Sequence, residues 1–139
     1  MLLIDNSAFA RLADPRLPVD RAGQIAGQIE RREIAVCLPF LLEAGYSARS
    51  AADHRTLLDR LTRLPHLELT PAVEAAALRA QAELARAGHH RLPPVDLIVA
   101  ALADQHDAGV LHYDSDYEIL AARTSLRFDS VWLAQRGIL

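Results

Sequence analysis

Met1-Leu2-Leu3-Ile4-Asp5-Asn6-Ser7 opens the chain with a short apolar run that ends abruptly in three polar residues. A continuous apolar run of this length is typical of a strand buried on both faces of a sheet. Similar runs recur at residues 34–38 and 110–113, and residues 126–132 and 66–69 have weaker strand character. Helical patterns separate these runs, so the sequence predicts an α/β domain with a mostly parallel sheet and helices on both faces.

Helix signals fill the segments between the predicted strands. Ser7 is the expected cap of the first helix, and Thr70 followed by Pro71 is typical of a cap and a first helical position. Gly88 and Gly109 are expected to end the two helices that precede them. The predicted helices cover residues 8–13, 18–32, 39–49, 51–64, 71–87, 95–107 and 117–123.

Length and composition restrict the class of protein. The 139 residues are enough for one domain with a core of its own, and 51% hydrophobic against 24% charged residues excludes a disordered chain. No apolar run approaches the roughly 18 residues of a membrane span, and Asp5 interrupts the first run too early for a signal peptide. The single cysteine, Cys37, excludes an internal disulfide and a cysteine-based zinc site. We therefore expect a cytoplasmic protein with no membrane association.

Charge is unevenly distributed along the chain. The formal net charge is −3, and residues 96–139 carry three Arg and seven acids, so the negative charge is concentrated in the last third. All 15 cationic side chains are Arg, whose planar guanidinium suits phosphate and carboxylate groups. A GC-rich coding sequence is the simpler explanation for the absence of Lys. The overall charge does not by itself indicate nucleic-acid binding.

Acidic residues from distant parts of the sequence are expected to meet at one edge of the sheet. Asp5 ends the first strand, and Asp114 and Asp116 follow the strand at 110–113. A crossover helix runs antiparallel to the strands, so its N-terminus lies at the carboxyl ends of those strands, where ligands bind in such sheets. This argument adds Asp96 and Glu43, which both lie near the starts of predicted helices.

A divalent cation would explain why so many acids gather there. Carboxylates held a few Å apart raise one another's pKa, and a bound cation relieves the repulsion. Oxygen ligands without Cys or His favour Mg²⁺ or Mn²⁺ over Zn²⁺. One or two such ions would activate water and clamp the oxygens of a phosphodiester, with Glu43 or Asp114 orienting the water or accepting its proton.

Each acid also has a simpler explanation. Asp5 would start an Asx turn with the two residues after it, and Glu43 would face solvent from its helix. Asp96 would cap its helix or complement the helix dipole, and Asp114-Ser115-Asp116 would form a polar turn before the next helix. None of these explanations predicts that all of the acids share one sheet edge.

Four motifs in order carry a family resemblance over nearly the whole chain. They are Asp5-Asn6-Ser7 after the first strand, Glu43 on the third helix, Asp96-Leu97-Ile98-Val99-Ala100-Ala101 on a late helix, and Tyr113-Asp114-Ser115-Asp116-Tyr117 after a strand. In this order and at this length the chain resembles PIN-domain proteins, in particular the VapC-type ribonuclease toxins of bacterial toxin–antitoxin pairs. The resemblance implies a single PIN-like domain over residues 1–139, with a three-layer α/β/α fold.

The same resemblance implies a Mg²⁺- or Mn²⁺-dependent endoribonuclease that inhibits translation and growth, forms a homodimer, and binds a cognate antitoxin whose C-terminal segment occupies the active groove. It implies an acidic quartet, matched here by Asp5, Glu43, Asp96 and Asp114. Asp5 and Asp96 would lie closest to the principal ion. Asp116 matches an additional acid, and Ser7, preceded by Asn6, matches a supporting hydroxyl.

One departure from the family pattern leaves a ligand undecided. His112-Tyr113 and Tyr117 stand where the family often has a small polar residue and Phe. The departure leaves open whether Asp114 or Asp116 is the direct ligand of the ion.

RNA that reaches an acidic pocket needs cations around the pocket. Candidates for phosphate contacts are Arg11, Arg16, Arg49 and Arg91, and each is equally explained as a solvated surface residue. An alternative function is a catalytically silent PIN-like module that binds RNA or a protein. A phosphoacceptor role for Asp5 is a further alternative, but the segment lacks the second acid, two residues on, of aspartyl phosphatases.

Overall fold

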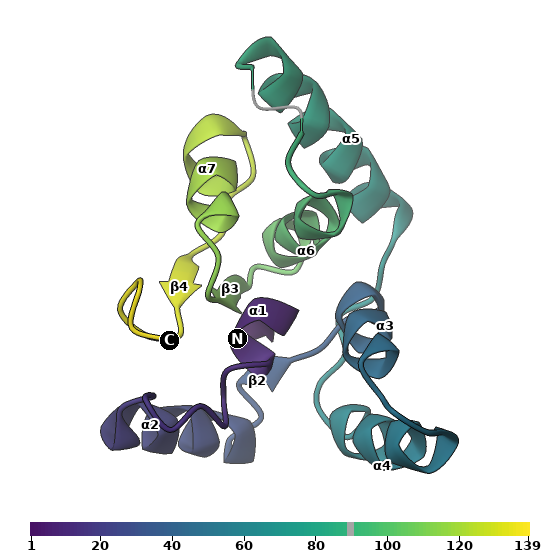
Figure 1. Ribbon diagram of the computed structural model, residues 1–139. Helices are drawn as coiled ribbons and strands as arrows, with labels where there is room; N and C mark the ends of the chain where they lie inside the picture. The colour runs from purple at the N-terminus through teal and green to yellow at the C-terminus, as the bar shows by residue number, and fades with distance from the viewer. Residues whose placement is uncertain (89–90) are drawn as a thin grey trace.

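The computed structural model describes residues 1–88 and 91–139, and shows a parallel sheet between two layers of helices (Figure 1). In chain order the elements are β1 (Leu2–Ile4), α1 (Asn6–Phe9), α2 (Val19–Glu30), β2 (Ile34–Ala35), α3 (Leu38–Tyr46), α4 (Ala51–Leu61), α5 (Pro71–Arg86), α6 (Pro94–Gln105), β3 (Gly109–His112), α7 (Asp116–Arg123) and β4 (Ser130–Trp132).

The four strands lie in the order β2-β1-β3-β4, and every neighbouring pair is parallel. Leu3 in β1 pairs with Ala35 in β2 and with Val110 in β3, so β1 lies inside the sheet. Helix α2 lies on one side of the sheet, and α6 and α7 lie on the other, with α5 packed outside α6 (Figure 1). The predicted α/β class with helices on both faces is confirmed.

The first helix differs from the prediction. It spans Asn6–Phe9 and not residues 8–13, and its cap is Asp5 and not Ser7. The Asp5 carboxylate accepts a hydrogen bond from the Ser7 backbone N–H at 2.9 Å, which ends the strand and starts the helix within two residues. The same carboxylate is therefore fixed next to the end of β1.

The two weakest strand predictions were wrong in extent. Residues 66–69 form one isolated bridge, between His66 and Val36, because the chain enters α5 at Pro71 before the pairing can continue. The last strand begins at Ser130 and not at residue 126, since the Arg127 N–H is bonded to the Asp104 carboxylate outside the sheet. Helix α2 stops at Glu30, two residues early, because Arg32 adopts a left-handed conformation with φ of 58°.

The topology brings four chain segments to one edge of the sheet. Strands β1 and β3 end there at Ile4 and His112, and helices α3 and α6 begin there at Leu38 and Pro94. The core beneath is apolar, and the buried polar or charged residues of the described chain are Asp5, Asp96 and His112. Buried polar groups at the end of a sheet need partners, and these partners define the site described next. Among the described residues, no helix is both long and apolar enough to cross a bilayer.

Candidate functional site

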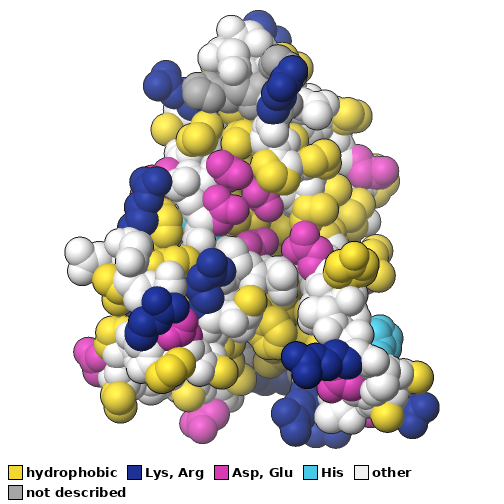
Figure 2. Space-filling view, viewed as in Figure 1, with side chains coloured by type: hydrophobic (Ala, Val, Ile, Leu, Met, Phe, Trp, Pro, Cys, Tyr) yellow, Lys and Arg dark blue, Asp and Glu magenta, His cyan; other side chains and the backbone are white. Residues whose placement is uncertain are grey.

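Three carboxylates meet at this edge. Asp96, Asp114 and Asp116 each offer an oxygen within 4.8 Å of the other two. Figure 2 shows acidic side chains gathered near the middle of this face, with arginine side chains around its margins. The geometry therefore brings together the residues predicted from β3 and from α6. Asp5 and Glu43 lie outside this group of three, but both contribute to the electrostatics around Asp96.

Asp96 is the most unusual of the acids. It lies in the first turn of α6 and is 9% exposed, but it is not the cap, which is Pro93 without any side-chain hydrogen bond. Its Oδ2 atom is buried with no hydrogen-bond partner among the described residues. Burial, followed by the charges of Asp5, Asp114 and other nearby acids, raises the pKa of Asp96 to about 7. A capping role therefore does not explain Asp96.

Both oxygens of the Asp5 carboxylate accept hydrogen bonds. Its Oδ2 accepts hydrogen bonds from the Ser7 N–H at 2.9 Å and from Ser7 Oγ at 2.5 Å. Its Oδ1 accepts a 2.8 Å hydrogen bond from the hydroxyl of Tyr117, which lies 3.5 Å from Asp96 Oδ1. The Asx turn predicted as the simpler role of Asp5 is present, and the carboxylate nevertheless faces the acidic group.

Ser7 joins the two strand ends that carry the acids. Its hydroxyl donates to Asp5 and accepts a 2.9 Å hydrogen bond from the Tyr113 backbone N–H, 106 residues away in sequence. A single hydroxyl thus ties the segment after β1 to the segment after β3. Ser7 does not cap the first helix, and its supporting role at the site remains a prediction.

Asp114 and Asp116 lie in a tight turn between β3 and α7. Asp114 Oδ1 accepts the Asp116 N–H at 3.0 Å, which is the polar turn expected as the simpler explanation. The Asp114 N–H donates to Nδ1 of the buried His112 at 3.1 Å, so the neutral ring carries its hydrogen on Nε2, 2.7 Å from Ser130 Oγ. Burial lowers the pKa of His112, and burial followed by the Asp114 charge raises the pKa of Asp116.

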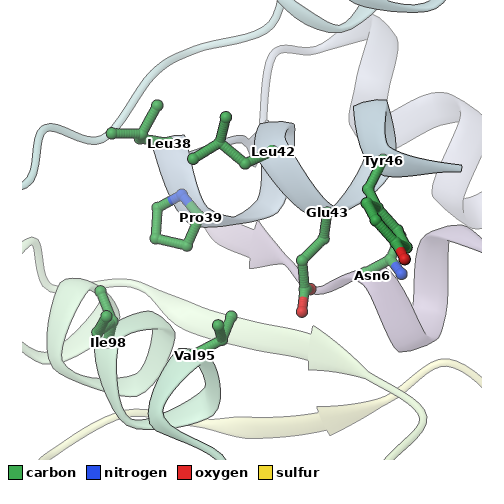
Figure 3. A pocket seen from close by; sticks show the side chains of 8 residues that line it. All are labelled: Asn6, Leu38, Pro39, Leu42, Glu43, Tyr46, Val95 and Ile98. Carbon is green, nitrogen blue, oxygen red and sulfur yellow. The ribbon is translucent and has the colours of Figure 1, made fainter. Parts of the chain in front are cut away.

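Glu43 and Asn6 border an apolar groove between α3 and α6. The groove has a volume of about 520 Å³. Figure 3 shows the Glu43 carboxylate directed between the two helices, beside Asn6 and Tyr46. Glu43 is half-buried, so it is not the fully solvent-facing residue considered from the sequence, and burial followed by the charge of Asp5 raises its pKa.

The four arginines proposed for phosphate contacts differ in their surroundings. Arg11 donates to the Ser7 carbonyl at 2.8 Å and lies 4.9 Å from the centre of the Tyr113 ring, close to the acids. Arg16 forms a 2.7 Å ion pair with Asp14. Arg49 and Arg91 are exposed. Their roles remain predictions.

Two features of the site were not predicted from the sequence. The first is the hydroxyl of Tyr117. Burial, followed by the charges of Asp5 and Asp96, raises its pKa well above the usual value, so the hydroxyl stays protonated. The second is the groove, whose apolar lining includes the exposed Leu38 and Leu42 on α3. Their spacing of four residues in a helix beside Glu43 was a signal that an apolar face continues into solvent.

Known proteins resemble this chain over most of its length. A family model described as the PIN domain matches residues 2–123. Ribonuclease VapC21 of Mycobacterium tuberculosis (strain ATCC 25618 / H37Rv) is 40% identical over 124 residues, which cover 88% of this chain and 87% of the relative. Ribonuclease VapC18 of the same strain is 32% identical over 139 residues, covering 98% of this chain and 97% of the relative.

Solved structures have the same fold. The DNA-bound VapBC structure from Salmonella typhimurium superposes with a TM-score of 0.72 at 20% identity, covering 96% of this chain and 100% of that chain. VapBC2 from Rickettsia felis, bound to a fragment of promoter DNA, gives a TM-score of 0.71 at 17% identity, covering 95% and 99% of the two chains. At these identities the likeness concerns the fold.

Proposed function

The chain belongs to the PIN domain family, and we propose that it is a metal-dependent endoribonuclease acting as the toxin of a toxin–antitoxin pair. Relatives at 32–40% identity are named ribonucleases, which supports the activity, and the structural neighbours are VapBC structures, which supports the antitoxin partner. The substrate would be RNA, and growth inhibition would follow from its cleavage.

The observation that carries this proposal is the buried Oδ2 of Asp96, which has no hydrogen-bond partner in residues 1–88 and 91–139. A carboxylate oxygen without a hydrogen bond is costly in a buried place, and other acids surround it. A divalent cation satisfies the oxygen and offsets the repulsion at once. The donor set consists of carboxylate oxygens, which suits Mg²⁺ or Mn²⁺ better than Zn²⁺. The residues therefore fit such an ion.

Four residues would hold the ion: Asp5, Asp96, Asp114 and Asp116. When bound, the cation supplies Lewis-acid chemistry, since it neutralises charge on phosphoryl oxygens and lowers the pKa of water. Asp114 would be the more constrained ligand, because one of its oxygens already accepts the Asp116 N–H. Asp116, whose carboxylate makes no hydrogen bond in the described part of the chain, would adapt to the ion more freely.

Glu43 would act as the proton acceptor. Its carboxylate borders the site from α3, and its raised pKa makes it a stronger base than an exposed glutamate. Asp5 is less suited to this task, because three hydrogen bonds already occupy its oxygens. The arginines at the margins of the acidic face would bind the phosphates on either side of the scissile bond (Figure 2).

The apolar groove beside Glu43 supports the expected antitoxin contact. Exposed Leu38 and Leu42 offer apolar surface to a peptide segment, and the acids next to the groove offer binding to a cationic side chain of that segment. An antitoxin bound there would cover the acids and block access of RNA. The homodimer implied by the family resemblance, the inhibition of translation and a cytoplasmic location are part of the same proposal.

Cleavage of RNA by the purified protein tests this function. With Mn²⁺ or Mg²⁺ we expect endonucleolytic cleavage of a single-stranded RNA, complete loss of cleavage in EDTA, and recovery when the metal is added back in excess. Single-stranded DNA of the same sequence is the control for substrate class. RNA binding without cleavage at any metal concentration would favour the silent binding module, and cleavage that persists in EDTA would contradict the metal-dependent mechanism.

A further inference from the structure

We propose that Tyr117 is a positioning residue, whose hydroxyl fixes the Asp5 carboxylate in the orientation that receives the divalent cation. This inference rests on the proposed function and concerns how the site is prepared for its ion. Tyr117 is fully buried in α7, and its hydroxyl reaches the acids from beneath, on the side of the core. It touches no position that substrate would occupy from solvent, so its effect must pass through the acids.

The direction of the hydrogen bond follows from distance and stoichiometry. A tyrosine hydroxyl has one hydrogen to donate. The hydroxyl oxygen lies 2.8 Å from Asp5 Oδ1 and 3.5 Å from Asp96 Oδ1, so Asp5 is the acceptor. Asp96 therefore lies beside the hydroxyl without a strong hydrogen bond from it. The hydroxyl thus lies within 3.5 Å of both carboxylates and donates to that of Asp5.

Asp5 is oriented by donors at both ends. Ser7 supplies the backbone N–H and the hydroxyl that bind Oδ2, and the Tyr117 hydroxyl is the donor to Oδ1 within the described residues. With both oxygens held, the carboxylate cannot rotate about its Cβ–Cγ bond. Oδ2 accepts two hydrogen bonds and Oδ1 accepts one, so Oδ1 keeps a lone pair for an ion. Without the Tyr117 hydroxyl, Oδ1 would lose its fixed direction and Asp5 would have to be ordered when the cation binds.

The donor is also neutral, which matters beside a cation site. An arginine or lysine in this place would satisfy Asp5 but would compete electrostatically with the ion. A phenol donates one hydrogen bond and leaves the negative charge of the acids in place. Its ring is fixed by packing, with its centroid 4.9 Å from that of His112 and 6.5 Å from that of Phe128. The hydroxyl therefore has a stable position before any ion arrives.

The test is a titration of Mn²⁺ into the Tyr117→Phe variant, followed by electron paramagnetic resonance of the free ion. Phe keeps the ring contacts and removes only the hydroxyl. We expect Mn²⁺ to bind about tenfold more weakly, the range found when partners of metal ligands are removed. RNA cleavage should fall at limiting Mn²⁺ and recover at saturating Mn²⁺, which a general loss of folding would not produce.

Tyr113→Phe is the matched control. The Tyr113 hydroxyl bonds to the Gln135 carbonyl at 3.2 Å and the Leu139 N–H at 2.9 Å, away from the acids. Its removal should leave Mn²⁺ affinity within about twofold of the wild type, as expected for a hydroxyl that makes no contact with the ligands. An unchanged or higher affinity in Tyr117→Phe would overturn the inference and leave the proposed function standing. No Mn²⁺ binding by the wild type would overturn the proposed function itself.

A measurement on the unmodified protein covers the case in which Tyr117→Phe does not fold. The hydroxyl proton of Tyr117 should give an NMR resonance protected from exchange with water, because the group is buried and bonded to Asp5. Under saturating Mg²⁺ the resonance should persist and show contact with Asp5. Its loss, or rapid exchange on addition of Mg²⁺, would mean that the bond breaks when the ion binds and would overturn the inference.

Discussion

Asp96→Asn should weaken Mn²⁺ binding by at least about a hundredfold, since even partners of metal ligands cost up to that factor when they are removed. RNA cleavage should fall by a similar factor or more. The reason is that Asp96 supplies a buried oxygen without a partner in the part of the chain that the structure describes, and the amide supplies no negative charge in its place. The same substitution should make the metal-free protein more stable near pH 8, because it removes a buried charge that other acids repel.

The opposite signs of these two effects make the prediction demanding. Replacing a residue with a purely structural role lowers both the stability and the activity of the protein. Replacing a carboxylate that binds an ion lowers the activity and raises the stability of the metal-free protein. Asp59→Asn, at an exposed position of α4, is the matched control and should change neither property. A variant at position 96 that binds Mn²⁺ as the wild type does would contradict the role of Asp96 as a ligand.

Mn²⁺ should stabilise the protein strongly at pH 8 and weakly at pH 5. In the metal-free folded protein the pKa of Asp96 is raised to about 7 from 3.8, so between these values the folded state holds a proton that the unfolded state has lost. Metal-free stability therefore falls as the pH rises through this range, by about 2 kcal/mol once solvent screening is allowed for. Metal binding needs the ionised carboxylate and so strengthens over the same range.

Thermal unfolding measures this linkage. At a Mn²⁺ concentration about a hundred times the dissociation constant, binding adds about 2.7 kcal/mol, which raises the unfolding temperature by roughly 10 °C. The Asp96→Asn variant is the reference at each pH, because it retains His112, whose lowered pKa gives the opposite slope below about pH 6.5. Equal Mn²⁺ stabilisation at pH 5 and pH 8 would contradict the account of Asp96.

The sequence was most informative where local pattern and topology agree. The apolar run that ends at Asp5 predicts an inner strand, and β1 lies between β2 and β3. Placing Asp5 and Asp114 at one edge required only the rule that parallel strands end together. The extent of short elements was harder to predict. Asp5 caps α1 by accepting a hydrogen bond from the Ser7 N–H, whereas a propensity argument assigned the capping role to Ser7.

The finer structure of the site could not be predicted because it depends on contacts between distant residues. Tyr117 looks like a core aromatic in the sequence, and its hydroxyl reaches Asp5, 112 residues away, only after α7 packs against the sheet. That Asp96 Oδ2 has no hydrogen-bond partner among the residues described is likewise a property of the packed structure. The spacing of the motifs predicts which acids form the site, but it does not predict which of their oxygens already accept hydrogen bonds.

Diffraction from crystals soaked in Mn²⁺, recorded near the manganese absorption edge, tests most directly whether these carboxylates hold a divalent cation. We expect an anomalous peak bounded by oxygens of Asp5, Asp96, Asp114 and Asp116, at metal–oxygen distances of roughly 2.0–2.4 Å. The peak should vanish in Asp96→Asn crystals treated identically. A clear peak elsewhere on the protein, or none among these residues at saturating Mn²⁺, would contradict the account.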